Sequence, residues 1–372
     1  MTNRQRLLAA LRYESYDRLP LVHFGFWAET IEKWNKEGHI ADADAEAVHD
    51  NSPNEQKLTK RLGFDFNFSC NFDTKSSLFP YFEPKLLEVQ PDGFHRMLNE
   101  DGAIVLVKPG VVSIPAEVGH TLVDRASWEE HYKWRLQYDD KRVDWEKLSA
   151  HKAINETRAF PLGFHMGSLF GRIRDVMGVI GISYLLEDDE ELYDEIINAF
   201  GDLQYTIAEK VLATGTKFDF AHYWEDICYN HGPLVNPSVF AEKVGPHYKR
   251  MTELCKRNGI DLISLDCDGQ IDALLPTWFE NGVNIMFPIE VGTWDASIAP
   301  WRAKYGRALR GVGGMNKTCF ARDYAAIDAE VERLRGLVEL GGYIPCPDHR
   351  IAPDAVFENV QYYCERMHRV FG

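Results

Sequence analysis

Eight apolar runs, each followed by a stretch with helical periodicity, most constrain what this 372-residue chain can fold into. Apolar runs that alternate with helices are typical of parallel strands joined by helical crossovers. Eight such units predict an α/β fold, the (β/α)8 TIM barrel. A doubly wound open sheet is the alternative, but no glycine-rich dinucleotide fingerprint follows the first run to support it. The runs are PLVHF (20–24), FDFNFSC (64–70), FPLGFHM (160–166), FDFAHYWED (218–226), IDLISLDCDG (260–269), NIMFPIE (284–290), ALRGVGGM (308–315) and GGYIPCPDHR (341–350).

The stretch between the second and third runs differs from the rest. Residues 90–108 alternate apolar and polar side chains around two Asp-Gly pairs, a pattern that predicts an antiparallel hairpin. The following WEEHYKWRL and DWEKLSAHKAI segments have the pattern of exposed amphipathic helices. We therefore predict a single barrel over residues 1–372, with a hairpin and helical insertion at about 80–155 after the second strand.

Charge and cysteine content exclude several classes of function. A formal net charge of −16 opposes unspecific binding to nucleic acid. Seven cysteines without a CxxC motif make a disulfide framework a poor interpretation, so we expect a reducing compartment. The LLAAL segment near Met1 is too short for a signal core, and no stretch has the length of a membrane span. A soluble, cytoplasmic protein is expected, with no membrane partner.

The last residues of four runs are acidic or imidazole side chains, which would converge at the mouth of a barrel. Asp266 and Asp268 stand on either side of Cys267, so in a strand both carboxylates point the same way and offer two hard oxygen ligands. For Asp268 alone, a turn and helix cap before residue 270 is an equally good interpretation.

The last and the sixth run supply two further candidates. His349 could bind a metal through one nitrogen while Asp348 orients the other, or it could simply bond a backbone carbonyl at a helix entry. Glu290 could be a ligand or a general acid or base, and its alternative is a salt bridge with Arg302.

At the end of the fourth run stand Glu225 and Asp226, of which we expect one to bind ligand and the other to cap a loop. Glu225 and Glu290 are taken as the catalytic candidates. Large side chains at other run ends predict an aromatic-lined mouth for a flat organic substrate, although core packing explains any single one as well. Lys317 could meet an anionic group, or be a solvated loop lysine. The predicted substrate-binding residues are Trp27, His165, Trp224, Met315 and Lys317.

Several segments resemble the uroporphyrinogen decarboxylase superfamily over nearly the whole chain except the insertion. That resemblance implies a TIM barrel. Decarboxylases of this superfamily carry a basic RQAGR-type segment after the first strand, whereas this chain has HFGFWAETIEKW there, without an arginine. A polyanionic tetrapyrrole is therefore an implausible substrate. The segments are RQRLLAALRYESYDRLPL, NPSVFAEKVGPHYKRM, DCDGQIDALLPTWFENGVNIMFPIE, GVGGMNK and GGYIPCPDHRIAPDAVFENVQYY.

The other branch of the superfamily comprises corrinoid-dependent methyltransferases, which hold zinc with a His-x-Cys pair and a C-terminal Cys. The resemblance puts Asp266, Asp268 and His349 at those three positions, each with a different identity from the family's. It thus implies zinc or another divalent metal on these residues, and cobalamin carried by a corrinoid partner protein.

A harder, oxygen-dominated site suits polarising an oxygen of the substrate more than activating a thiol. We therefore predict an O-demethylase-like methyltransferase that moves a methyl group from a small methoxylated, aromatic substrate to cobalt, with Glu290 or Glu225 orienting ligands or delivering a proton. The alternatives are a metal-dependent lyase, decarboxylase or hydrolase acting on a small oxygenated substrate, a metal-free acid/base set, and, least favoured, a binding protein. A homodimer is compatible with the sequence.

Overall fold

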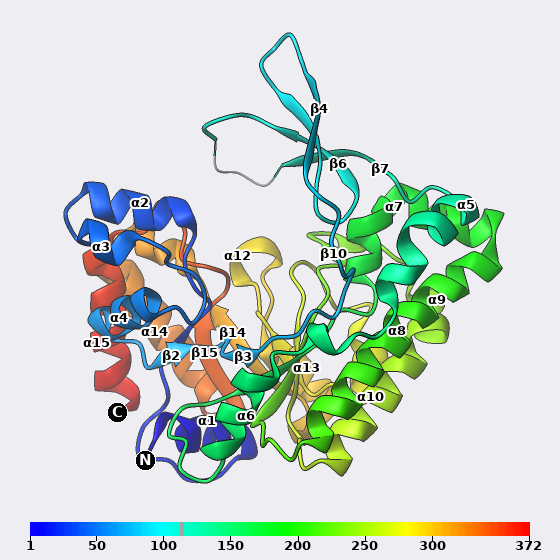
Figure 1. Ribbon diagram of the computed structural model, residues 1–372. Helices are drawn as coiled ribbons and strands as arrows, with labels where there is room; N and C mark the ends of the chain where they lie inside the picture. Colours follow the sequence, from blue (N-terminus) through cyan, green and yellow to red (C-terminus); the bar gives the residue numbers. More distant parts are fainter. Residues whose placement is uncertain (112–114) are drawn as a thin grey trace.

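Seven parallel strands form the central sheet of the computed structural model, which describes residues 1–111 and 115–372 (Figure 1). Their order across the sheet is β15-β14-β13-β12-β9-β8-β3, so strands that follow one another in the chain lie next to one another in space. Six of the seven fall within a predicted run or extend one residue beyond it, whereas β3 begins directly after the second run. The strands are β3 (Asn71–Phe72), β8 (Gly163–Gly167), β9 (Phe220–Trp224), β12 (Ile263–Asp266), β13 (Ile285–Phe287), β14 (Arg310–Met315) and β15 (Tyr343–Pro347).

The first two runs complete a TIM-barrel-like arrangement. The second run contains only β2 (Phe66–Asn67), which pairs in parallel with β1 (Val22–His23). The strand β3, which directly follows this run, pairs with β8. Beyond β1 and β15, the chain forms an isolated parallel bridge between Phe26 and Ile351. Full closure into a (β/α)8 barrel stays a prediction.

Helices cover the outer side of the sheet and bury their apolar faces against it (Figure 1). In the long α7 the helical conformation breaks at Gly178, whose φ is +74°. The helices are α2 (Ala28–Lys36), α3 (Asp42–Ala45), α4 (Pro53–Leu62), α7 (Gly171–Asp188), α8 (Glu190–Ala213), α9 (Pro237–Val239), η4 (Phe240–Val244), α10 (Gly245–Arg257), α11 (Leu275–Glu280), α12 (Val291–Trp294), α13 (Ile298–Tyr305), η5 (Gly306–Ala308), η6 (Lys317–Ala321), α14 (Tyr324–Val338) and α15 (Phe357–Phe371). A short hairpin, β10 (Cys228–Tyr229) and β11 (Gly232–Pro233), follows β9.

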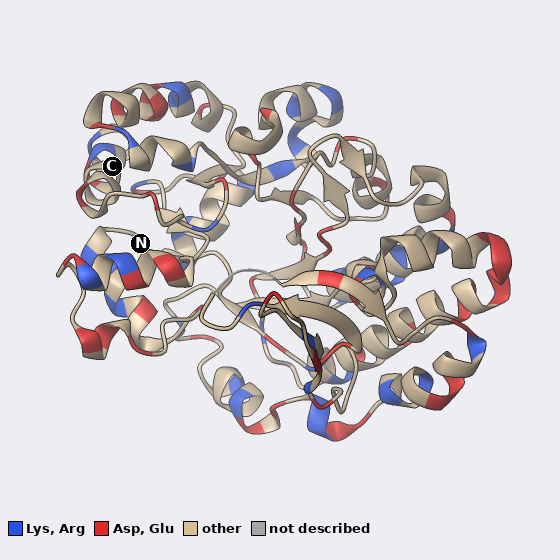
Figure 2. Ribbon diagram, turned by 90° about the horizontal axis from the view of Figure 1, so that it is seen from above, with Lys and Arg blue, Asp and Glu red and all other residues tan. Residues whose placement is uncertain are grey.

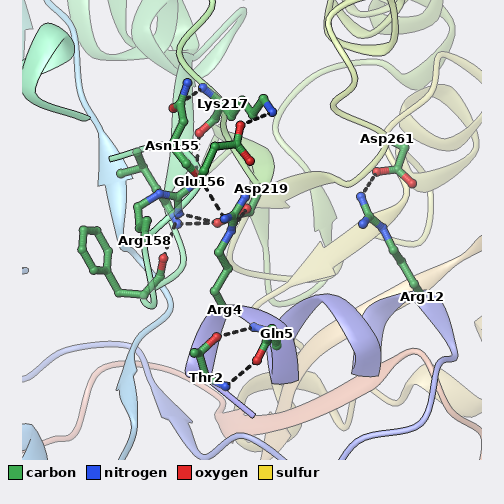
Figure 3. A network of polar contacts seen from close by, with 12 residues as sticks. Thr2, Arg4, Gln5, Arg12, Asn155, Glu156, Arg158, Lys217, Asp219 and Asp261 are labelled. Atoms are coloured by element: carbon green, nitrogen blue, oxygen red, sulfur yellow. Dashed lines mark hydrogen bonds and ion pairs between the residues drawn. The ribbon is translucent and has the colours of Figure 1, made fainter. Parts of the chain in front are cut away.

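The first helix, α1 (Asn3–Arg12), lies at the N-terminal ends of the strands. Arg4 and Arg158 both pair with Asp219, directly before β9, at 2.7 and 2.5 Å, while Arg12 pairs with Asp261, before β12 (Figure 3). Apolar residues of α1 join side chains from β1, β9, β13, β14 and β15 in a small separate core. The C-terminal ends of the strands therefore face the other way, away from α1.

Residues 85–111 and 115–120 contain a four-stranded antiparallel sheet that projects from the molecule on the side away from α1 (Figure 1). The sequence predicted only a hairpin here, because the outer strands β4 and β7 are largely exposed and lack a clear alternation. Residues 112–114 of the predicted insertion lie outside the described part of the chain. The strands are β4 (Lys85–Val89), β5 (His95–Leu98), β6 (Ala103–Val107) and β7 (Ala116–His120).

Between this sheet and β8, the WEEHYKWRL segment predicted as an α-helix is instead a π turn followed by a 3-10 turn, whereas DWEKLSAHKAI contains the expected α-helix. The elements are α5 (Arg125–Ser127), η1 (Trp128–Tyr132), η2 (Lys133–Leu136), η3 (Asp140–Arg142) and α6 (Trp145–Ala153). Seen from above, acidic and basic residues are interspersed on the outer helices, and acidic segments also lie on loops near the centre (Figure 2). Within residues 1–111 and 115–372, no helix has both the length and the apolarity to cross a membrane.

Candidate metal and substrate site

Three aspartates meet where β9 and β12 end. The two strands pair in parallel with Trp224 opposite Asp266, so the residues that follow them leave the sheet side by side. Oxygens of Asp226, Asp266 and Asp268 lie within 4.8 Å of one another. Asp226 has a φ of +46°, a left-handed conformation that is uncommon for a non-glycine residue and turns the chain at this point. Among the described residues, this is the one cluster with the spacing of a metal site.

Burial makes this concentration of negative charge costly. Asp266 is only 6% exposed, and burial together with Asp226 and Asp268 raises its pKa well above the usual range. Burial and Asp268 raise the pKa of Asp226 to about 7. Within the described residues, Oδ1 of Asp268 is buried without a hydrogen-bond donor. A bound divalent cation would fit this donor set, because it would satisfy the orphaned oxygen and offset the mutual repulsion.

His349 lies beside the three aspartates. Its Nε2 is 3.1 Å from Oδ2 of Asp268. The imidazole stacks on Trp27, with ring centroids 5.5 Å apart and planes within 13°, and meets the edge of Phe24. These aromatic contacts hold the ring at the cluster, where Nε2 could serve as a fourth ligand or keep Asp268 in position.

Asp348 does not orient His349 as the sequence suggested. Its carboxylate instead accepts hydrogen bonds from the backbone N–H groups of Gly292 at 2.7 Å and Lys317 at 3.1 Å. Asp348 therefore joins the ends of β13, β14 and β15 rather than setting the tautomer of the imidazole.

A cavity of about 410 Å³ opens beside this cluster. Three of the five residues predicted to bind substrate line it, namely Trp27, His165 and Trp224. Met315 does not, since it is fully buried in the core, and Lys317 lies at the start of η6 outside the lining set. The lining residues are Phe24, Trp27, Asp50, Asn51, Ser69, Asn71, Asp73, His165, His222, Trp224, Asp226, Asp266, Asp268, His349 and Arg350.

Glu225, predicted as catalytic, faces α7 and not the cavity. It is fully buried, and its carboxylate satisfies N–H groups at the N-terminus of α7, where the helix dipole favours negative charge. Its donors are the backbone N–H groups of Leu169, Phe170 and Gly171 at 2.7 to 3.0 Å, Ser168 Oγ at 3.0 Å, and the Tyr248 hydroxyl. Of the pair at the end of β9, Glu225 is thus the cap and Asp226 the residue at the acidic cluster.

Glu290 also lies outside the cavity lining, one strand from the aspartates. Its carboxylate accepts the backbone N–H of Gly269 at 2.5 Å and the hydroxyl of Thr293 at 2.9 Å. The alternative salt bridge is not formed, because Arg302 donates to the carbonyls of Leu309, Leu340 and Gly341. Burial and the nearby Asp268 raise the pKa of Glu290. Glu290 therefore holds the turn that carries Asp268.

Several lining residues were not singled out from the sequence. Ser69, near the end of the second run, alternates with Asn71 and Asp73 just beyond it, a polar period-two pattern that could have identified them. Asp50 and Arg350 form a two-contact ion pair at 2.9 and 2.5 Å, but 300 positions separate them in the chain. No local pattern could have predicted that pair.

No protein-family model matches the sequence, and no curated protein matches it. Among solved structures, the chain is similar to a methyltransferase from Methanosarcina mazei, with a TM-score of 0.60 over 99% of both chains and 15% identity. A putative vitamin-B12 independent methionine synthase from Listeria monocytogenes has a TM-score of 0.42 at 12% identity, over 96% of this chain and 98% of that one. A B12-independent methionine synthase from Shewanella sp. W3-18-1 has 0.42 at 11%, over 84% and 85%. The likeness to the Methanosarcina mazei protein shows a common fold.

Proposed function

We propose that this protein is a metal-dependent methyltransferase that transfers the methyl group of a small methoxylated aromatic compound to the cobalt of cobalamin on a separate corrinoid protein. The observation that carries the proposal is the cluster of Asp226, Asp266 and Asp268 with His349 beside it, at the C-terminal ends of parallel strands and next to an aromatic-walled cavity. The fold that the chain shares with a methyltransferase supports methyl transfer in particular.

Asp226, Asp266, Asp268 and His349 would hold the cation, zinc or another divalent ion. Three carboxylate oxygens and one imidazole nitrogen make a hard donor set. When bound, such a cation supplies Lewis acidity toward an ether oxygen. In the proposed transfer the oxygen would keep the electron pair of the broken C–O bond, and cobalt(I) of the partner's cobalamin would supply the pair for the new bond to the methyl group.

The chain's own residues bind and orient the ring. Trp27 and Trp224 provide flat apolar walls, and Trp27 also fixes His349 by stacking. Arg172 lies 4.8 Å from the centroid of the Trp224 ring and packs on that side chain. Glu290 positions Asp268 through Gly269, and Glu225 anchors the chain that carries Asp226. Both glutamates are positioning residues in this proposal.

The test combines metal content with methyl transfer. Protein prepared in metal-free buffer and reloaded with zinc would be mixed with methoxyarenes and cob(I)alamin, free or on a corrinoid protein, and the conversion to methylcobalamin followed by absorbance. We expect conversion that depends on zinc and is lost in Asp266→Asn. The matched control is Asp354→Asn, which changes an exposed aspartate away from the cavity.

Two outcomes would contradict the proposal. If no donor yields methylcobalamin while the zinc protein turns over small oxygenated compounds, the lyase, decarboxylase or hydrolase alternative is favoured. If the purified protein binds no divalent ion stoichiometrically and Asp266→Asn leaves activity unchanged, the Lewis-acid role fails.

A further inference from the structure

The part of the cavity built by β3 and β8 contains hydrogen-bonding groups outside the acidic cluster. His165, on β8, lines the cavity, as does Asn71, on the adjacent β3. The acidic cluster comes from β9 and β12 instead. What these two groups can bind therefore limits the substrate independently of the metal.

His165 presents a donor to this space. The backbone N–H of Gly167 donates to its Nδ1 at 3.1 Å, so the neutral imidazole carries its proton on Nε2. Within residues 1–111 and 115–372, Nε2 has no hydrogen-bond partner. Burial lowers the pKa of this imidazole, which keeps it neutral. An uncharged N–H donor is the result.

Asn71 supplies a second polar group on the neighbouring strand, at the level of Gly163, two residues before His165. The residue is only 9% exposed, and its Oδ1 is buried with no partner in the described part of the chain. Gly163, its register partner on β8, leaves room for the amide, because a Cβ there would collide with Oδ1. An unpartnered amide oxygen of this kind costs free energy, and turning the amide toward a ligand in the cavity would remove that cost.

The charges around the cavity disfavour an anionic substrate. Five aspartates line it against one arginine, and that arginine, Arg350, is already paired with Asp50. The two arginines that pack on Trp224, Arg172 and Arg174, both pair with Asp175. A bound divalent cation would still leave the lining negative. A carboxylate on the ring would therefore be repelled.

We infer that the site selects uncharged methoxyarenes, such as methoxyphenols and methoxybenzamides, over methoxybenzoates, with His165 Nε2–H and Asn71 binding an uncharged oxygen or amide of the ring. The inference rests on the proposed function, which supplies the class of substrate, a methoxylated aromatic compound. It adds that the preferred substrate carries no charge. A cavity of about 410 Å³ has room for a single substituted ring.

The experiment is direct binding, which needs no methyl transfer. Zinc-loaded protein would be titrated calorimetrically with 4-hydroxy-3-methoxybenzamide and with 4-hydroxy-3-methoxybenzoate, which match in shape and differ in charge. We expect the amide to bind about tenfold tighter or more. Asp73→Asn removes one negative charge at the exposed rim of the cavity and should therefore reduce the ratio between the affinities for the amide and the benzoate. His165→Phe should weaken binding of the amide by about 3–10-fold, because the donor is lost. His165→Gln, which keeps a donor, should restore part of the lost affinity.

Equal or tighter binding of the benzoate would overturn the inference, as would binding of neither ring or an unchanged affinity in His165→Phe. Asp73→Asn keeps the test decisive if the His165 variants fold poorly. If the amide binds with the expected preference but no methyl transfer follows, the proposed function fails and the charge selectivity stands.

Discussion

Replacing Asp266 by Asn should raise the free energy of unfolding when no metal is bound and lower it when a divalent metal is bound. Asp266 is buried, and its carboxylate shares space with Asp226 and Asp268. In the metal-free protein the three carboxylates repel one another, so a neutral amide of the same shape removes a destabilising interaction. In the metal-bound protein the same change removes a ligand. The variant should therefore be more stable than the wild type in chelator and less stable in zinc.

The magnitude follows from the spacing. Two unit charges 4.8 Å apart repel by about 3 kcal/mol at an effective dielectric constant of about 20. Asp266 takes part in two such pairs, but protons already relieve some of the repulsion, since the pKa values of Asp226 and Asp266 are raised, and the Asp268 side chain is 32% exposed. We expect a gain of about 1–3 kcal/mol in the free energy of unfolding, or roughly 1–4 °C in Tm for a chain of 372 residues.

The assay is thermal unfolding at pH 8 in EDTA and again with zinc. A ligand at about 1,000 times its Kd stabilises by about 4.1 kcal/mol, which exceeds the expected gain from the substitution. Zinc at that concentration should therefore raise the Tm of the wild type above that of Asp266→Asn and leave the Tm of the variant nearly unchanged. Asp354→Asn is the control and should follow the wild type in both buffers. The reasoning is refuted if Asp266→Asn is the less stable protein in EDTA, or if zinc stabilises both proteins equally.

Three further predictions concern the site and its supports. The free energy of unfolding in EDTA should fall as pH rises from about 4 through about 7. The folded protein keeps protons on Asp226, with its pKa of about 7, and on Asp266, whose pKa is also raised, whereas the unfolded chain has lost both. Urea titrations should show a shallower fall in Asp226→Asn. Glu225→Gln should lower the free energy of unfolding by about 2–4 kcal/mol, because an amide cannot accept every donor at the start of α7, and an unchanged urea midpoint would contradict the capping role. Gly178→Ala should lower the free energy of unfolding by about 1–3 kcal/mol, because φ is +74° and the new Cβ would lie 2.5 Å from His120. Adding His120→Ala should recover only the part of this loss that comes from the steric contact, and full recovery would argue against backbone strain.

Strand positions could be read from the sequence because each buried strand is a local apolar run. All eight runs contain a strand, and the resemblance to a barrel superfamily agrees with the TIM-barrel-like order of the sheet. The sequence did not predict which strands pair with one another or where some helices begin, because neighbouring elements of the fold set these details. The chain changes strand partner between β2, in the second run, and β3, which lies beyond that run and was not predicted. The helix expected from residue 270 begins only at Leu275. Such boundaries depend on tertiary contacts that propensity does not record.

In the candidate site, too, the sequence could identify some residues and not others. Asp266, Asp268 and His349 could be found because strand ends converge on one mouth, whichever residues they carry. The choice between Glu225 and Asp226 could not be made, since both carboxylates follow the same strand. Only the packing of α7 against β9 decides it, because the helix N-terminus takes Glu225 and leaves Asp226 beside Asp266.

By itself, then, the sequence determined the alternation of strands and helices and the acidic character of the strand ends, since both are properties of short segments. The tertiary structure alone decided which carboxylates face one another, which are neutralised by backbone N–H groups, and how Asp50 meets Arg350. Those outcomes depend on distances between residues far apart in the chain, and electrostatic repulsion and burial act through such distances and not through sequence neighbours.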